Sequence, residues 1–173
     1  MDRVYGPDLM ELSLERGIPL GWRHFFYGGA PGVTEELKEK VEQRFPGVQI
    51  AGMYTPPFRP LNAGEERELT ELVDRCRPDI IWVGLSTPKQ EKFMSNYLPK
   101  LNATLMVGVG AAFDFHSGRV KQAPRWMQRS GTEWFYRLCQ EPRRLWKRYL
   151  KNNPLFLGRI VMQKFGMRKY SLE

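Results

Sequence analysis

The sequence predicts an α/β fold, a Rossmann-like parallel sheet with helices on both faces, followed by a basic helical C-terminal appendage. The first observation is a regular alternation of short apolar runs with amphipathic stretches up to residue 109. The second is charge: residues 1–118 hold 13 Lys and Arg against 16 Asp and Glu, whereas residues 119–173 hold 14 against 3. The net charge of +8 therefore comes from the tail. We expect a partial α/β core over 1–118 and an appendage over 119–173.

The first elements along the chain are predicted as helix, strand and helix. Pro7–Arg16 is expected to be a helix, Trp22–Tyr27 a strand and Gly28–Gly32 a tight turn. Thr34 is then expected to cap a helix whose apolar residues recur every four positions: Leu37, Val41 and Phe45.

The rest of the core repeats this alternation. Val48–Tyr54, 79–85 and Thr104–Val109 have the near-continuous apolar character of strands buried on both faces. The intervening helices are expected around Leu69–Cys76 and over 88–98.

Several classes of function find no support in the composition. Cys76 and Cys139 form no Cys-x-x-Cys pattern, which argues against a metal or disulfide framework and favours a reducing compartment. No apolar run reaches the length of a membrane-spanning helix, and no signal peptide is recognised. His24 is expected to be a satisfied, semi-buried strand residue and His116 a surface loop residue.

Ligands of such folds bind beyond the carboxyl ends of the strands, where two glycine-containing segments lie. Gly28 and Gly29 offer backbone N–H groups to a phosphate, or simply make the turn. In the second segment, Gly108 and Gly110 let backbone approach a ligand closely. Asp114 follows them as an acceptor for a sugar hydroxyl or base N–H, or as a helix or turn cap.

A third segment, Gly84–Glu91, carries the most unusual chemistry. Thr87 is expected to cap a helix that begins at Pro88. Gln90 then lies in the first turn, where its amide can donate to and accept from sugar or diphosphate oxygens. The helix N-terminus favours an anion there. Lys89 adds charge or is merely solvated, and Glu91 orients its neighbours.

Five motifs in this order resemble the WecG/TagA/CpsF glycosyltransferase family (glycosyltransferase family 26), over the chain up to about residue 157. They are GPDLM (Gly6–Met10), YGGAPGV (Tyr27–Val33), PDIIWVGLSTPKQEKF (Pro78–Phe93), VGVGAAFDFHSGRVKQAPRW (Val107–Trp126) and EWFYRLCQEPRRLWKRYL (Glu133–Leu150).

The resemblance implies an inverting-type reaction. N-acetylmannosamine, or its uronic acid, would move from a UDP donor to a polyprenyl-diphosphate-linked N-acetylglucosamine. The products feed wall teichoic acid, enterobacterial common antigen or capsule. The UDP-sugar is then a substrate, and no cofactor or essential metal is implied.

The resemblance also assigns residues. Gln90 belongs to the family's active-site glutamine motif, and Arg3 matches an active-site arginine. Arg137, Arg143, Arg144 and Arg148 match arginines of the appendage, which closes over the active site. Some of these are expected to reach the nucleotide diphosphate, for which a guanidinium fork is suited.

One departure from the family concerns the catalytic base. The family carries an upstream A-D-G motif with the expected base, and no part of the 173 residues corresponds to it. We therefore expect the N-terminal strands and the base to be missing, through a late start, a shortened clone or a natural fragment. Asp114 is the cleft carboxylate that remains. A catalytically inactive UDP-sugar-binding fragment is the alternative reading.

The tail suggests a partner. Basic and apolar residues interleave after Glu133 and again after Pro154, as in segments that bind anionic lipid surfaces. We expect a cytoplasmic protein, peripheral on the inner face of a bacterial plasma membrane. A helical hairpin packed on the core is the alternative. A nucleic-acid-binding module is a rival for so basic a tail, but it leaves the glycine turns and Pro88–Glu91 unexplained, and we expect no nucleic-acid partner. Homo-oligomerisation stays open.

Overall fold

The computed structural model describes residues 5–165, apart from the side chains of Arg144, Arg148 and Lys151. The chain divides into two compact units, Met1–Lys121 and Gln122–Glu173. The division falls three residues after the change in charge at residue 118. Each unit is described by itself below.

Unit 1, Met1–Lys121, contains one parallel four-stranded sheet in the order β2-β1-β3-β4. The strands are β1 (Arg23–Gly28), β2 (Gln49–Tyr54), β3 (Ile80–Gly84) and β4 (Leu105–Gly108). Strands β2, β3 and β4 lie within predicted apolar runs, and β1 extends one residue beyond its predicted run, to Gly28. The predicted α/β class is confirmed.

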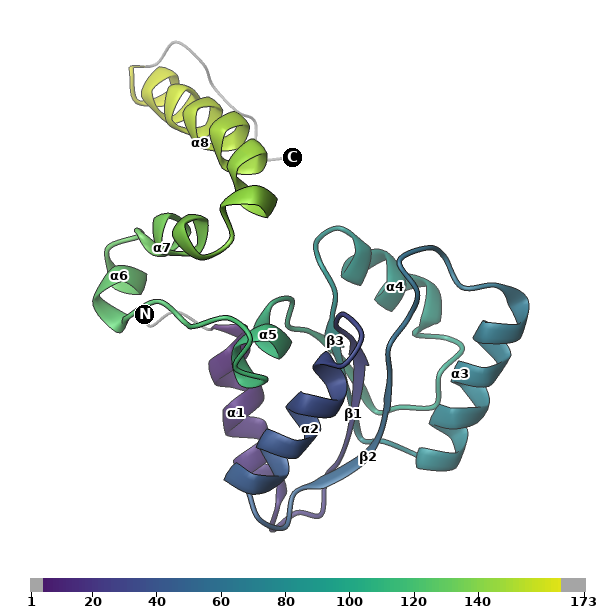
Figure 1. The fold of residues 1–173 in the computed structure, drawn as a ribbon. Helices are drawn as coiled ribbons and strands as arrows, with labels where there is room; N and C mark the ends of the chain where they lie inside the picture. The colour runs from purple at the N-terminus through teal and green to yellow at the C-terminus, as the bar shows by residue number, and fades with distance from the viewer. Residues whose placement is uncertain (1–4, 166–173) are drawn as a thin grey trace. The chain divides into compact units, whose positions relative to one another are not determined.

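Helices cover both faces of this sheet (Figure 1). They are α1 (Gly6–Gly17), α2 (Val33–Arg44), α3 (Ala63–Cys76), α4 (Lys89–Tyr97) and α5 (Ala112–His116). Because successive strand residues point to opposite faces, Phe26 and Trp82 pack with α1, α2 and α5, whereas Phe25 and Ile81 pack with α3 and α4. Two hydrophobic layers therefore hold the sheet.

The strand order places a topological switch point between β1 and β3. From β1 the chain turns outward to β2, and after β3 it turns the other way to β4. In open α/β sheets, ligands bind in the crevice at the carboxyl ends of such strands. The start of α1 also lies at this edge, because Gly6 packs against the backbone of Val109.

Unit 2 is helical within its described residues. Its helices are α6 (Arg125–Arg129), α7 (Glu133–Gln140) and α8 (Pro142–Lys164), and α8 continues through Pro154. Trp134 of α7 meets Tyr149 of α8 edge to face at 5.9 Å between ring centroids. Many large apolar side chains remain exposed, among them Leu150, Leu155, Phe156, Leu157 and Phe165.

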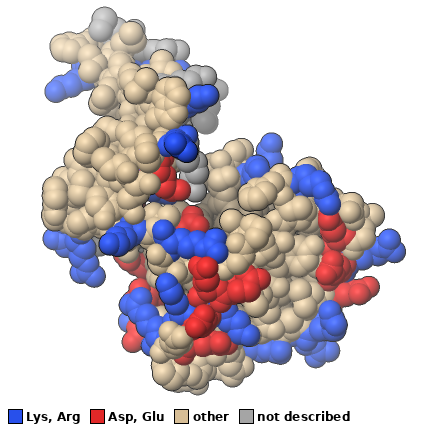
Figure 2. All heavy atoms as spheres, viewed as in Figure 1, with Lys and Arg blue, Asp and Glu red and all other residues tan. Residues whose placement is uncertain are grey.

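The visible face of these helices is mostly uncharged, with basic groups spread over it (Figure 2). Across the part of the chain that the structure describes, no helix combines the length and the apolar character needed to cross a membrane.

Two predicted helix starts are wrong. The N-cap of α2 is Gly32 at φ 81°, not Thr34, which is buried with its hydroxyl 2.7 Å from that of Thr55. Helix α4 begins at Lys89 with Pro88 as its N-cap, after a cis Thr87–Pro88 peptide bond. The Thr87 hydroxyl donates to Glu91 Oε1 instead of capping the helix backbone.

Both histidine predictions need correction. His24 is fully buried, and its Nδ1 accepts from Trp82 Nε1–H at 3.1 Å, but its Nε2 has no hydrogen-bond partner within residues 5–165. Burial lowers the pKa of His24 to about 4, against a smaller opposing effect of Asp79. His116 is half-buried at the end of α5, where Nε2–H donates to the Pro7 carbonyl oxygen at 3.0 Å. Burial lowers its pKa too.

Candidate functional site

The ends of β1 and β3 touch through bare backbone. Gly28 pairs with Gly84, and the Gly29 N–H donates to the Gly84 carbonyl oxygen at 3.1 Å. A Cβ on Gly28, whose φ is 128°, would lie 2.6 Å from that oxygen. Glycine is therefore required for this approach. The Gly29 N–H already donates to a backbone oxygen of the protein. These glycines therefore let the two strands approach closely, and the Gly29 N–H does not make the expected donation to a phosphate.

Phe113 of α5 packs against Gly84 at the switch point, on the face of the sheet that α2 covers. A Cβ on Gly84 would overlap the Phe113 ring, which also meets Phe26 edge to face at 5.6 Å. Sequence reasoning missed Phe113, because it lies among small residues that suggested an open loop. Its signal was the single bulky apolar residue directly after two alanines. Asp114 follows it in the same helix.

Gln90 joins the loops that follow β3 and β4. Its Oε1 accepts from the Gly110 backbone N–H at 3.1 Å, and its Nε2 donates to Glu91 Oε1 at 3.1 Å. The amide lies against Gly108, where a Cβ would come within 3.0 Å of Nε2. The structure thus brings together Gln90, Glu91, Gly108 and Gly110, as the sequence predicts for one site.

Lys89, Pro88 and Thr87 form the exposed rim of the same loop. The Glu91 carboxylate accepts from the Thr87 hydroxyl as well as from Gln90. Its pKa lies below the ordinary value, first because of its own backbone N–H at the start of α4, then because of Gln90 and Thr87. An ionised carboxylate therefore sits beside the Gln90 amide.

Asp114 is partly exposed in α5, and the hydrogen bonds at this residue are made by its backbone. The Asp114 carbonyl oxygen accepts from the Ser117 hydroxyl and from the Val120 N–H. Within residues 5–165 its carboxylate has no hydrogen-bond or ion-pair partner. The carboxylate is therefore available to a ligand.

Arg119 supplies a cation that the sequence reasoning did not single out. Its guanidinium pairs with both carboxylate oxygens of Glu36, at 2.7 and 2.8 Å, and also contacts the Pro31 carbonyl oxygen at 3.3 Å. This hydrogen bond holds the pKa of Glu36 below its usual value. An Arg119–Glu36 ion pair thus lies at the turn that leads into α2.

The predicted arginines lie outside the described part of unit 1. Arg137 and Arg143 belong to unit 2. Arg3 lies outside the described residues, as do the side chains of Arg144 and Arg148. Their assignment stays a prediction. Among residues 5–165, no three His, Cys, Asp or Glu gather into a group that could hold a metal ion.

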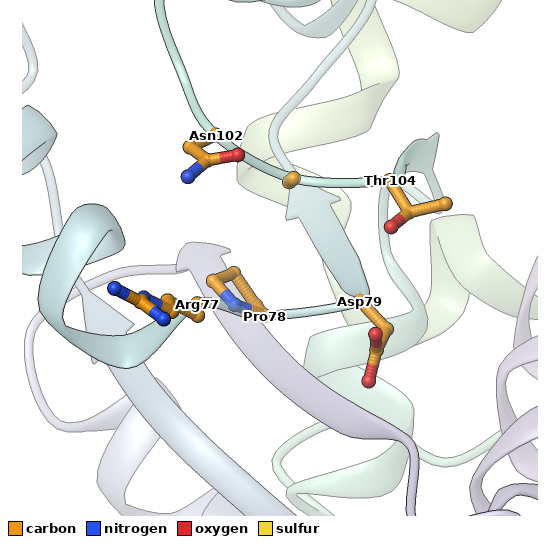
Figure 3. Close-up of a pocket in the computed structure, with 6 residues that line it drawn as sticks. Arg77, Pro78, Asp79, Asn102 and Thr104 are labelled. Atoms are coloured by element: carbon orange, nitrogen blue, oxygen red, sulfur yellow. The ribbon is translucent and has the colours of Figure 1, made fainter.

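A shallow pocket of about 250 Å³ lies at the opposite edge of the sheet, where the amino ends of β3 and β4 begin (Figure 3). It is lined by Arg77, Pro78, Asp79, Asn102, Ala103 and Thr104. Asp79 already has a structural task, since its Oδ2 accepts from the Arg23 N–H at 2.7 Å. In open α/β sheets, ligands bind at the carboxyl edge, where the loops after β1 and β3 lead away in opposite directions. This rule favours the carboxyl edge, and not the pocket at the amino edge, as the functional site.

A parallel sheet with helices on both faces and glycine-lined loops at its switch point defines a doubly wound α/β protein. The chain matches the Glycosyl transferase WecG/TagA/CpsF family over residues 1–170, so it belongs to that family. The resemblance drawn from the motifs is thereby confirmed.

Two relatives carry the name N-acetylglucosaminyldiphosphoundecaprenol N-acetyl-beta-D-mannosaminyltransferase. That of Bacillus spizizenii is 37% identical over 148 residues, which cover 86% of this chain and 55% of the relative. That of Bacillus subtilis is 38% identical over 148 residues, covering 86% and 56%. The chain thus spans about half the length of the curated relatives it matches.

Proposed function

We propose that this chain forms the donor side of an N-acetylmannosaminyltransferase. N-acetylmannosamine, or its uronic acid, would pass with inversion from UDP to a polyprenyl-diphosphate-linked N-acetylglucosamine. The observation that carries the proposal is the Gln90 amide bridging the loops after β3 and β4, beside the Gly28–Gly84 backbone contact, in a member of this family. The names of the two relatives support the sugar and the lipid-linked acceptor.

The proposed binding mode follows from where the helices begin. Helices α2 and α4 both start at the carboxyl edge of the sheet, and the N-terminus of a helix carries partial positive charge. The UDP diphosphate is expected there, with the small glycine loops allowing close approach. Arg119 lies beside the start of α2, where the Glu36 carboxylate balances its charge.

Transfer requires a proton acceptor for the attacking sugar hydroxyl, whose intrinsic pKa is far above neutrality. A positioned base contributes on the order of 10²–10⁴-fold. Gln90 cannot be that base, because an amide accepts no proton at neutral pH. Among the described residues we nominate the Asp114 carboxylate, because that of Glu91 already accepts from Thr87 and Gln90. Asp114→Asn measures how much Asp114 contributes to the transfer rate. We also propose that no metal is needed, which full activity in excess EDTA would support and metal-dependent activity would overturn.

UDP release from UDP-N-acetylmannosamine, with a short-lipid diphosphate N-acetylglucosamine as acceptor, tests the reaction. The Bacillus subtilis relative serves as the positive control. We expect calorimetric UDP binding by this chain and feeble transfer, with both lost in Gln90→Ala. Gln43→Ala, the same change on the exposed side of α2, should leave binding unchanged. A folded chain that does not bind UDP would remove the proposal.

We propose attachment to anionic lipid as a second function, located in unit 2. The exposed side chains of Leu155, Phe156 and Leu157 lie on α8 together with Arg159 and Lys164. Exposed apolar groups beside cations suit the boundary between headgroups and acyl chains. Attachment to the membrane would bring the enzyme to its lipid-linked acceptor. We propose that the chain binds the inner face of the plasma membrane.

A further inference from the structure

The Gln90 side chain is held from both ends by groups of opposite character. The Gly110 N–H can only donate, so it must face the amide oxygen, and the distance to Oε1 is 3.1 Å. The ionised Glu91 carboxylate can only accept, so it must face the amide nitrogen. The distance from Gln90 Nε2 to Glu91 Oε1 is 3.1 Å. Two independent contacts therefore select the same orientation of one amide.

We infer that Glu91 is a positioning residue, which fixes the Gln90 amide so that Gln90 offers a free N–H to an oxygen of the donor substrate. A flipped amide would set its NH₂ group against the Gly110 N–H and its oxygen against the carboxylate. Both contacts would then be repulsive, because a donor would face a donor and an acceptor would face an acceptor. The inference rests on the proposed function and deepens it.

The consequence is a specific chemical preference. With Oε1 engaged by Gly110 and one N–H by Glu91, Gln90 has one N–H and the second lone pair of Oε1 left. The free N–H, whose direction the two contacts set, suits an oxygen acceptor of a diphosphate or sugar.

Thr87 completes the arrangement. Its Oγ1 donates to the same carboxylate oxygen, Glu91 Oε1, at 3.1 Å. Because Thr87 lies before α4 and Glu91 lies within it, this bond ties the loop after β3 to the helix that carries Gln90. The side chain of Glu91 is exposed, so its two hydrogen bonds, and not packing, restrain it.

The test begins without any ligand, on the full chain, by NMR of the Gln90 side-chain amide and the Gly110 N–H. In Glu91→Ala we expect the Gly110 N–H to exchange with solvent at least tenfold faster and the Gln90 amide signals to move. Glu91→Gln keeps an acceptor oxygen and should restore most of both. Glu71→Gln on the exposed side of α3 is the matched control and should change neither.

A charge swap provides the decisive comparison. Q90E sets two carboxylates side by side and is expected to weaken UDP binding more than tenfold. Q90E/E91Q restores a donor–acceptor pair with its direction reversed and should bring the Gly110 N–H exchange of Q90E back toward the wild-type rate. Position 90 still has no N–H in this variant, so UDP binding should stay weak. If a charge variant fails to fold, the Thr87 variants give the comparison. Thr87→Val loses the hydroxyl that holds Glu91 and should speed the Gly110 N–H exchange, whereas Thr87→Ser keeps the hydroxyl and should not.

The outcomes separate the two proposals. If UDP does not bind the wild-type chain, the proposed function fails, while the ligand-free NMR comparison still decides the role of Glu91. Unchanged Gly110 exchange in Glu91→Ala, or wild-type UDP affinity in Q90E/E91Q, would overturn the inference. With a turnover assay, we expect Glu91→Ala to raise KM for the donor more than it lowers kcat.

Discussion

A Cβ on Gly28 would lie 2.6 Å from the carbonyl oxygen of Gly84, so these two strand ends meet at a distance that glycine alone allows. The contact joins β1 and β3 at the switch point, where the proposed donor site lies. Stability and ligand binding are therefore expected to depend on the same pair of residues.

Gly28→Ala should destabilise unit 1 by about 3 kcal/mol, since it adds an overlap with backbone to the strain of a positive φ. Urea unfolding followed by circular dichroism measures this loss. Gly21→Ala is the matched control: its φ is 66°, but the nearest atom to its added Cβ is 3.9 Å away. It should cost only about 1 kcal/mol. Equal losses in both variants would show that the Gly84 contact is not tight.

Because His24 is buried in its neutral form, we expect the folded protein to lose stability below neutral pH. Its folded-state pKa is about 4, against an ordinary value of 6.5, because burial disfavours the charged ring. Between these values the unfolded chain binds more protons than the folded one, so stability falls as the pH drops through 6.5 and levels off below 4. From pH 7.5 to 5.5 the loss should be roughly 1 kcal/mol.

His24→Asn isolates that contribution, because an amide oxygen can still accept from the Trp82 N–H. The variant should lose roughly 1 kcal/mol less than wild type between pH 7.5 and 5.5 in urea titrations. The contribution of His116 is common to both proteins and cancels. Parallel pH profiles for wild type and variant would contradict the role of His24.

Lipid binding should depend on the exposed apolar residues of α8. Phe156→Ser combined with Leu157→Ser is expected to reduce sedimentation with phosphatidylglycerol vesicles about tenfold, while unfolding stays the same. Leu20→Ser with Leu98→Ser changes side chains of similar exposure, 64% and 63%, in unit 1 and should have no effect. Wild-type binding should weaken with salt, as expected for cations near anionic lipid. Undiminished binding by the α8 variant would place attachment elsewhere.

Local sequence predicted the layers of the fold well. The run over 79–85 is apolar because β3 is covered on both faces, and Leu37 and Val41 recur at four-residue spacing because α2 buries one face. Glycine pairs marked the switch point because they stand where strands end. These features are set within a few residues of chain, so a pattern can show them.

Sequence patterns could not show which segments that are distant in the chain contact each other. Thr34 has the composition of an N-cap, but its hydroxyl partner, Thr55, lies one strand further along the chain. The buried His24 was expected to be satisfied, but where it packs against Trp82 and Gly17 its Nε2 has no hydrogen-bond partner among the described residues. In the site, the sequence named Gln90 and Gly110 but could not show that one already binds the other.

The most direct test of the account is an amide ¹H–¹⁵N shift map of the full chain titrated with UDP. We expect the largest changes at Gly84–Gln90 and Gly108–Gly110, at the carboxyl edge of the sheet, and their loss in Gln90→Ala. The pocket at the opposite edge provides the internal comparison, and Asn102→Ala should leave the map unchanged. Saturable changes centred on Arg77–Asp79 and Asn102–Thr104, with Gly84–Gln90 unmoved, would contradict the assignment of the donor site.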